Sequence, residues 1–211
     1  MMHSSPSVSA PVSAQPHSAP GLLQPIADFL IRRRILLSGI LFTLLISGNV
    51  LFGPKPHDLT DFRDPISVAG GLLVLSGLAL RSWSVGILRK DAELTMTGPY
   101  RLIRNPLYVG SFLMMFGFCA WIDDSRNFWL ILGPMLLIYF VKVRQEERLL
   151  ATLFPAQWAG YARSTPRFIP RFARLSLKAD WRAAQWMRSR EYQALGATLI
   201  ALIAIKIWQW I

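Results

Sequence analysis

Cysteine and histidine are scarce in this sequence, which has one cysteine, Cys119, and three histidines, His3, His17 and His57, among 211 residues. A lone cysteine cannot form a disulfide within the chain. With so few of these side chains, we expect neither a metal site built from them nor a histidine proton relay. The sequence also lacks a strand followed by a glycine-rich loop, which argues against a Rossmann-type nucleotide site.

Charged residues are also few, at 17% of the chain, whereas 53% is hydrophobic and the mean hydropathy is +0.35. This composition is too apolar for an ordinary soluble domain and indicates an integral membrane protein. The net charge of +11 raises the alternative of nucleic-acid binding. The basic residues, however, lie between long apolar runs, so we expect a bilayer and no nucleic acid as partner.

The chain begins with residues 1–31, rich in Ser, Pro and Ala at their start, which we expect to be disordered. Five apolar runs follow, at residues 35–52, 66–88, 107–122, 128–143 and 194–211. A spanning helix needs about 20 apolar residues, so the first, second and last runs are long enough. The third and fourth, with 16 residues each, are expected to form a short hairpin. The sequence therefore predicts an all-α polytopic membrane protein with about five transmembrane helices.

Lysine and arginine counts alternate between the segments that flank these runs, with 3, 2, 4, 1 and 11 in chain order. The positive-inside rule then puts the N-terminus and both long basic segments on the cytoplasmic side, and the C-terminus on the opposite side. Residues 89–106 and 144–170 should therefore meet at one end of the helices, where cytosolic cosubstrates can reach them.

The stretch TGPYRLIRNPLYVG, residues 97–110, allows two interpretations. In the first it only sets topology, because Asn105 is a good N-cap, Pro106 suits the first helical position, and Arg101 and Arg104 are positive-inside charges. In the second, the same groups face a charged cosubstrate.

A second stretch, VKVRQEERLL at residues 141–150, places Glu146 and Glu147 at the end of the fourth run, where the helix dipole disfavours carboxylates. Either the helix continues to about Phe154, or the acids have a cationic partner. That partner is an i,i+4 salt bridge from Lys142 or, alternatively, a bound cationic ligand. The aromatic residues that follow form either a hairpin on the bilayer surface or a lid over a site.

Together, GPYRLIRNPLYVG and the downstream EERLLATLFPAQWAGYARSTPRFIP resemble the integral-membrane family of isoprenylcysteine carboxyl methyltransferases and bacterial phospholipid-type methyltransferases. The family pattern is G-x-Y-x-x-x-R-H-P-x-Y-x-G, then E-E-x-x-L-x-x-x-F-G-x-x-Y-x-x-Y and a P-x-x-x-P ending. The resemblance covers roughly residues 66–170. It implies a methyltransferase that binds S-adenosylmethionine in a cytoplasmic-side pocket and acts on a lipid or lipidated acceptor with a carboxylate or amine head group.

The resemblance also implies roles for single residues. Catalytic roles fall on Arg104, Arg144 and Glu146, of which Glu146 suits the cationic part of the cosubstrate and the arginines suit an anionic group. Lys142 and Arg144 would face the acceptor. Cosubstrate contacts fall on Glu93, Leu94, Thr95, Tyr100, Asn105, Pro106, Leu107, Tyr108 and Glu146.

This sequence departs from the family pattern at two positions, with Asn105 in place of histidine and Pro155 in place of glycine. Asparagine keeps a donor and an acceptor but no titratable ring. Arg81, inside the second run, is a separate candidate for binding the acceptor, because an intramembrane charge marks a functional site by default. Alternatively, Arg81 snorkels to the interface, ~10 Å away by helix rise.

The sequence thus divides into residues 1–31, a first transmembrane helix and loop at 32–65, a methyltransferase-like core at 66–170, a basic segment at 171–193 and a last helix at 194–211. The basic segment contains Trp and Leu, so we expect a helix in the membrane interface, with a solvated linker as the alternative. Two other functions stay open, a lipid reductase that uses a nicotinamide cofactor and a non-catalytic membrane protein. The sequence identifies neither the methyl acceptor nor the oligomeric state.

Overall fold

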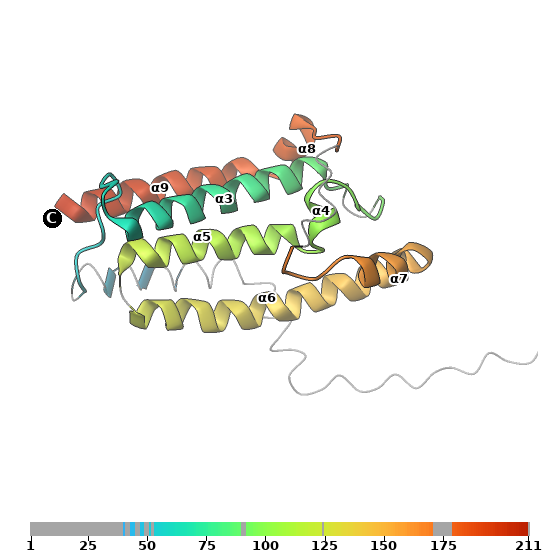
Figure 1. The fold of residues 1–211 in the computed structure, drawn as a ribbon, viewed down its shortest axis with the longest axis horizontal. Coiled ribbons are helices and arrows are strands. Elements are labelled where there is room, and N and C mark those ends of the chain that lie inside the picture. Colours follow the sequence, from blue (N-terminus) through green and yellow to red (C-terminus); the bar gives the residue numbers. More distant parts are fainter. Residues whose placement is uncertain are drawn as a thin grey trace, which may run out of the picture.

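The computed structural model describes residues 40, 43–44, 47–48, 51, 53–89, 92–123, 125–170 and 179–210, with only the helix path given over 125–132. Every regular element within these ranges is a helix, which confirms the all-α fold class for this part of the chain (Figure 1). The principal helices are α3 (Pro65–Ile87), α4 (Pro99–Leu102), α5 (Pro106–Ile122), α6 (Ser125–Leu153), α7 (Pro155–Ser164), α8 (Ala183–Arg188) and α9 (Glu191–Trp210).

Four of the expected apolar runs correspond to long helices. Helices α3 and α9 are long and apolar enough to span a bilayer, with mean hydropathies of 1.5 and 1.3, and α5 is a shorter apolar helix. Helix α6 continues past the acidic pair to Leu153, as one of the two interpretations expected. The first run, 35–52, lies largely outside the described residues, so the count of about five spans stays a prediction.

Helices α3 and α5 pack closely because glycines face each other at two levels. A side-chain carbon added to Gly77 would lie 2.5 Å from the carbonyl oxygen of Gly110, and one added to Gly117 would lie 2.5 Å from that of Gly70. Such small-residue contacts let helix backbones meet directly in a membrane, where no hydrophobic force draws helices together. The two contacts hold α5 antiparallel against α3, one near the start of α5 and one near its end.

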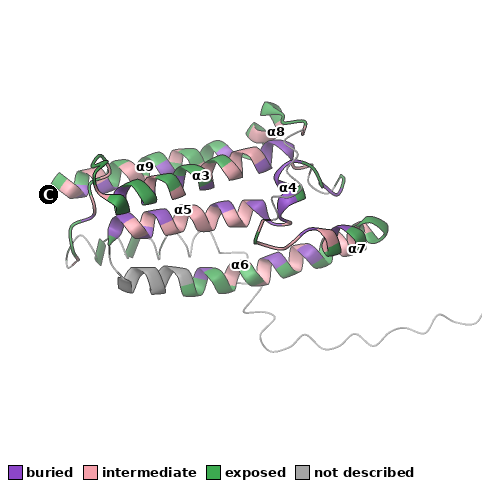
Figure 2. Ribbon diagram, viewed as in Figure 1, coloured by how far each residue is buried: buried purple, intermediate pink, exposed green. Residues whose placement is uncertain are grey.

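The core lies between α3, α5 and α9, where Val74, Trp121 and Ile205 are buried. The outer sides of α3 and α9 are exposed over much of their length (Figure 2). They carry large apolar residues that include Leu72, Leu75, Leu199, Ile200 and Ile203. Exposed apolar faces along helices of this length suit contact with lipid rather than with water.

The two ends of the bundle are built from different segments. At one end, the N–H of His57 donates to the carbonyl of Trp121 at 2.8 Å, and Lys206 Nζ donates to Asp58 Oδ1 at 2.6 Å. The C-terminal end of α9 lies there too, whereas α4, α7 and α8 lie at the opposite end (Figure 1). Which end faces the cytoplasm stays a prediction.

Residues 89–106 and 144–170 do meet at the second end, as the sequence predicted. The N–H of Arg104 donates to the carbonyl of Pro166 at 2.8 Å, and the Tyr161 hydroxyl donates to the carbonyl of Tyr100 at 2.7 Å. These bonds join α4 and the start of α5 to α7 and the chain that follows it.

The basic segment 171–193 differs from the single interfacial helix that we expected. Residues 171–178 lie outside the described part, α8 covers only six residues, and α9 already begins at Glu191. Arg190, with φ of 56°, separates the two helices, because a left-handed residue interrupts the helical path.

Candidate active site

The chain turns sharply between residues 97 and 106. Gly98 has φ of 57°, a conformation that glycine adopts without strain, and Pro99 begins α4. Pro106 lies in the first turn of α5, as expected. Asn105 occupies the N-cap position, but its side chain makes no capping hydrogen bond, so that part of the expectation is wrong. Its amide bonds to α6 and to the chain after α7 instead.

Glu147 is the centre of a buried polar group, with only 7% of the residue exposed. Arg167 donates to it through Nε at 3.0 Å and through Nη2 at 2.6 Å. Asn105 Nδ2 donates to Oε1 at 3.1 Å and to the Arg167 carbonyl at 3.4 Å, and Arg104 Nη1 lies 3.5 Å from Oε1. Several donors are what a buried carboxylate needs to offset its lost hydration. The bond to Glu147 also raises the pKa of the Arg167 guanidinium.

From the sequence we assigned a site role to Glu146 but none to Glu147 or Arg167. A signal for Glu147 was present: Met135, Tyr139 and Val143 precede it at intervals of four, and Met135 and Val143 are buried. Residues four apart share one helix face, so Glu147 continues the inward face of α6. Arg167 had no local signal, because its partners lie twenty or more residues away.

Glu146 lies at the edge of this group and is half-exposed. Its carboxylate accepts a hydrogen bond from the Tyr108 hydroxyl at 2.9 Å, and Lys142 Nζ lies 3.7 Å from the same oxygen. The rings of Tyr108 and Tyr139 pack edge to face at 5.2 Å. The expected i,i+4 salt bridge is therefore present, together with an aromatic wall. Leu107, beside Tyr108, accepts a hydrogen bond from Ser111 through its carbonyl.

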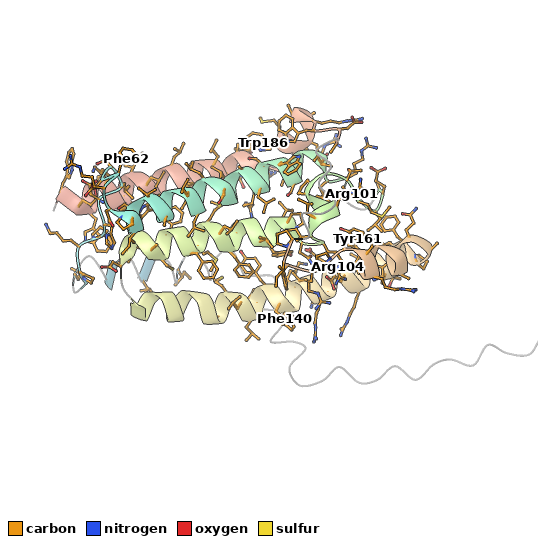
Figure 3. All side chains as sticks on the ribbon, viewed as in Figure 1. Phe62, Arg101, Arg104, Phe140, Tyr161 and Trp186 are labelled. Carbon is orange, nitrogen blue, oxygen red and sulfur yellow. The ribbon has the colours of Figure 1, made fainter. Side chains whose placement is uncertain are left out.

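Arg144 is not brought into this group. It is exposed, and its guanidinium lies over the ring of Phe140 at 4.6 Å. Phe140 lies on the side of α6 away from α5 (Figure 3). The catalytic and acceptor-binding roles expected for Arg144 stay predictions, and the side chain would have to change its position to reach Glu146.

Two buried polar atoms at this end of the bundle have no hydrogen-bond partner within the described part of the chain, the Tyr100 hydroxyl and Arg104 Nε. Burial raises the pKa of Tyr100 far above its ordinary value, so the hydroxyl stays protonated and can donate. The Arg104 guanidinium lies 5.8 Å from the Trp158 ring, and Figure 3 shows Arg104 and Tyr161 between α5 and α7. An unpaired buried donor costs roughly 1–3 kcal/mol, which a polar ligand atom would recover.

The stretch 93–95 makes its contacts toward α3. Glu93 is exposed and pairs with Arg89 at 3.3 Å, while Leu94 and Thr95 are buried and the Thr95 hydroxyl accepts the N–H of Arg89 at 3.3 Å. These residues lie at the same end of the bundle as Glu147. Their contact with a cosubstrate stays a prediction.

Arg81 is held by side chains inside the protein, and its expected contact with the acceptor stays a prediction. Its guanidinium donates to Glu191 at 2.8 and 3.0 Å and to the Ser111 hydroxyl at 2.6 Å. Glu191, at the start of α9, is only 4% exposed. The Arg81 charge is therefore paired inside the protein, where it joins α3, α5 and α9.

A cavity of about 350 Å³ lies elsewhere at this end of the bundle, between the end of α3 and α8. Its lining contains neither Glu146 nor Glu147. Within the described residues there is no group of three or more His, Cys, Asp or Glu side chains placed to hold a metal ion.

Comparison with known proteins gives one family and two relatives. The sequence pattern of the phospholipid methyltransferase family matches residues 66–157. The chain is 32% identical over 172 residues to the cobalt-zinc-cadmium resistance protein CzcN of Cupriavidus metallidurans, covering 80% of this chain and 78% of that protein. It is 30% identical over 151 residues to the nickel-cobalt-cadmium resistance protein NccN of Alcaligenes xylosoxydans xylosoxydans, covering 71% and 70%. No solved structure gives a significant match.

Proposed function

Because this chain belongs to the phospholipid methyltransferase family, we propose that it transfers a methyl group from S-adenosylmethionine to a lipid or lipidated acceptor at the membrane surface. The observation that carries the proposal is the polar group around Glu147, where the two family-like motifs meet at one end of the bundle. Neither motif forms this group alone, because Asn105 and Arg104 come from the first and Glu147 from the second.

The residues of this group suit the chemistry of the cosubstrate. S-adenosylmethionine, when bound, supplies an activated methyl on a sulfonium, with an ammonium, a carboxylate and an adenine ring. The half-exposed Glu146 suits the cationic groups. Arg104 Nε and the Tyr100 hydroxyl are buried donors that suit the anionic and polar groups. The ring of Tyr108 suits adenine or cation–π contact, worth roughly 0.5–2 kcal/mol.

Glu147 holds other residues of this site in position and does not itself contact the cosubstrate. Its bonds to Arg167 and Asn105 hold the chain after α7 against the start of α5. A separate ion pair with Glu147 keeps Arg104 in place over the Trp158 ring. Methyl transfer from a sulfonium needs alignment more than proton transfer, and alignment supplies up to about 7–11 kcal/mol in favourable cases.

A carboxylate acceptor fits this arrangement better than an amine. An amine must lose a proton, and both candidate bases are already engaged, Glu147 by two arginines and Glu146 by Tyr108 and Lys142. Asn105, in place of the family histidine, provides no base either. A lipid or lipidated carboxylate needs none.

The names of the two relatives suggest a physiological setting. CzcN and NccN are named for resistance to cobalt, zinc, nickel and cadmium ions. We propose that this chain contributes to metal resistance by modifying lipid. Deletion of its gene should then increase sensitivity to these metals, and a Glu146→Ala variant should fail to restore growth. Full rescue by that variant would separate resistance from methyl transfer.

The proposal is tested with the full chain in membranes and in detergent. Membranes that contain the protein, given S-adenosylmethionine with a labelled methyl group, should yield a labelled lipid on extraction and mass analysis. Glu146→Ala should weaken cosubstrate binding by more than about 1 kcal/mol, the value of a charge-assisted hydrogen bond. Asp61→Ala, which removes an exposed acid at the opposite end of the bundle, is the matched control and should bind normally. Binding of NADPH instead would support the reductase alternative, and binding of neither would overturn the enzyme proposal.

A further inference from the structure

The cavity beside α3 has walls from two distant parts of the chain. The first wall is the end of α3 and the loop after it, and the second is the segment that leads into α8. The lining residues are Gly86, Ile87, Arg89, Ala92, Asp180, Arg182, Gln185 and Arg188. The second wall lies beyond residues 66–157, the part of the chain that matches the family pattern.

The second wall is firmly attached to α3. The indole of Trp181 donates to the Ser82 carbonyl at 3.1 Å, and that of Trp186 donates to the Ser82 hydroxyl at 3.2 Å. The N–H of Arg182 donates to the Gly86 carbonyl at 2.9 Å. Gly86 has no room for a side chain because the Trp181 ring lies against it. The cavity is therefore shaped by specific bonds, and Trp186 is seen against the end of α3 in Figure 3.

The lining carries an excess of positive charge. Arg182, Gln185 and Arg188 follow one another at intervals of three residues and so lie on one face of the α8 turn, toward the cavity. Arg89 lies on the opposite wall and pairs with Glu93. Asp180 is the one acid among the lining residues. The three arginines therefore outnumber the two acids, Asp180 and Glu93, by one charge. Neither Arg182 nor Arg188 has an ion-pair partner within the described ranges.

Like charges that line one concave surface repel each other and concentrate counter-ions. Guanidinium groups bind phosphate oxygens through two parallel hydrogen bonds. The cavity sits where α3, a helix long enough to span a bilayer, ends at Ile87. The ends of a spanning helix lie beside the lipid head groups. A volume of about 350 Å³ is at the small end of ligand pockets and fits a head group.

We propose that this cavity binds the phosphate of an anionic lipid head group, through Arg182 and Arg188. The site is separate from the group around Glu147 and does not depend on methyl transfer. Free inorganic phosphate has the same recognition chemistry, so the test must compare the two.

The test uses full-length protein in detergent micelles, without cosubstrate, titrated calorimetrically with dihexanoyl phosphatidylglycerol and with inorganic phosphate. Both should bind, the lipid more tightly, and the double variant Arg182→Gln/Arg188→Gln should weaken each by about tenfold. Arg163→Gln removes an exposed arginine on α7 and is the matched control, which should change binding less than about twofold. Phosphate that binds as tightly as the lipid would identify the free ion as the ligand and would overturn the lipid assignment.

A variant that is expected to gain affinity serves as a further control, because misfolding weakens binding and does not strengthen it. Asp180→Asn removes the acid of the lining and should strengthen lipid binding by about threefold. Equal losses in the double variant and in Arg163→Gln would show general surface attraction and overturn the proposal. So would unchanged binding in both the double variant and Asp180→Asn. Because cosubstrate is absent throughout, failure here leaves the methyltransferase proposal untouched.

Discussion

Glu146 and Glu147 are neighbours in sequence but have opposite environments, because consecutive residues point to different faces of α6. Glu147 faces α5 and is surrounded by Arg167, Arg104 and Asn105. Glu146 faces the edge of the group and is half-exposed. One carboxylate therefore stabilises the fold around the site, and the other can be reached by a ligand.

This difference predicts two distinct phenotypes. Glu147→Gln leaves the Arg167 and Arg104 charges without their anion and should lower the unfolding free energy by roughly 1–3 kcal/mol, because Arg167 is partly exposed. Glu146→Gln loses a half-exposed pair and should cost less than about 1 kcal/mol. The melting temperatures of both variants in detergent measure this. A larger loss of unfolding free energy in Glu146→Gln than in Glu147→Gln would show that Glu146, and not Glu147, has the structural role.

At single positions, sequence reasoning identified residue types better than partners. It selected Arg104, Asn105 and Tyr108 from local pattern, and all three lie in or beside the group around Glu147. It missed Arg167, which carries no pattern of its own and acquires its role only when α7 folds back. Charge pairs between distant segments are fixed by packing, which a single sequence does not state.

One of the contacts that attach α9 to the rest of the bundle is the ion pair between Arg81 of α3 and Glu191. Removing one partner leaves a charge in an apolar setting, so Arg81→Met and Glu191→Met should each destabilise the protein by about 3–5 kcal/mol. The double variant should recover most of that loss, because no uncompensated charge remains. Unfolding of all three variants in detergent gives the coupling energy. Additive losses would mean that the pair contributes nothing beyond its separate side chains.

The contact between α3 and α5 predicts a contrast between two glycines. Gly77→Ala places a carbon 2.5 Å from the Gly110 carbonyl oxygen and should cost roughly 1–3 kcal/mol, because neither backbone can yield. Gly196→Ala, on α9, meets nothing within 4 Å and should be neutral or stabilising by up to about 1 kcal/mol. Thermal unfolding of both variants distinguishes packing from helix propensity. A stabilising Gly77→Ala would contradict the close packing.

The long helices were the most predictable elements. Runs 66–88, 107–122 and 194–211 became α3, α5 and α9 with small shifts at their ends, because uninterrupted apolar residues leave few alternatives. The segment around α8 was predicted as one helix and is not. Its path follows Trp181 and Trp186, whose indoles bond to Ser82 about a hundred residues earlier. The composition of this segment indicated a membrane interface, but it did not indicate that the segment would bond to α3.

At the scale of the whole bundle, the described part of the chain has polar groups at each end, besides the Arg81–Glu191 pair between the helices. One end has the group around Glu147 and the arginine-lined cavity, and the other has the Asp58–Lys206 pair. The end of α9 also lies at the second end (Figure 1). In the reaction that we propose, a lipid acceptor and a water-soluble cosubstrate would meet at an end of the bundle. The first end is the one we propose, because it carries the polar group in which the two family-like motifs meet.

This arrangement predicts how the chain lies across the membrane. The native Cys119 is buried and should react weakly with a membrane-impermeant maleimide, so added cysteines report their own exposure. The positive-inside rule places α7 in the cytoplasm and the end of α9 outside. In intact spheroplasts, Trp210→Cys should be labelled, whereas Arg163→Cys should be labelled only after permeabilisation, since both positions are exposed at opposite ends. The reverse labelling pattern would mean that the chain has the opposite orientation in the membrane, with the same arrangement of helices. Labelling of both from the same side would show that α9 does not cross the bilayer.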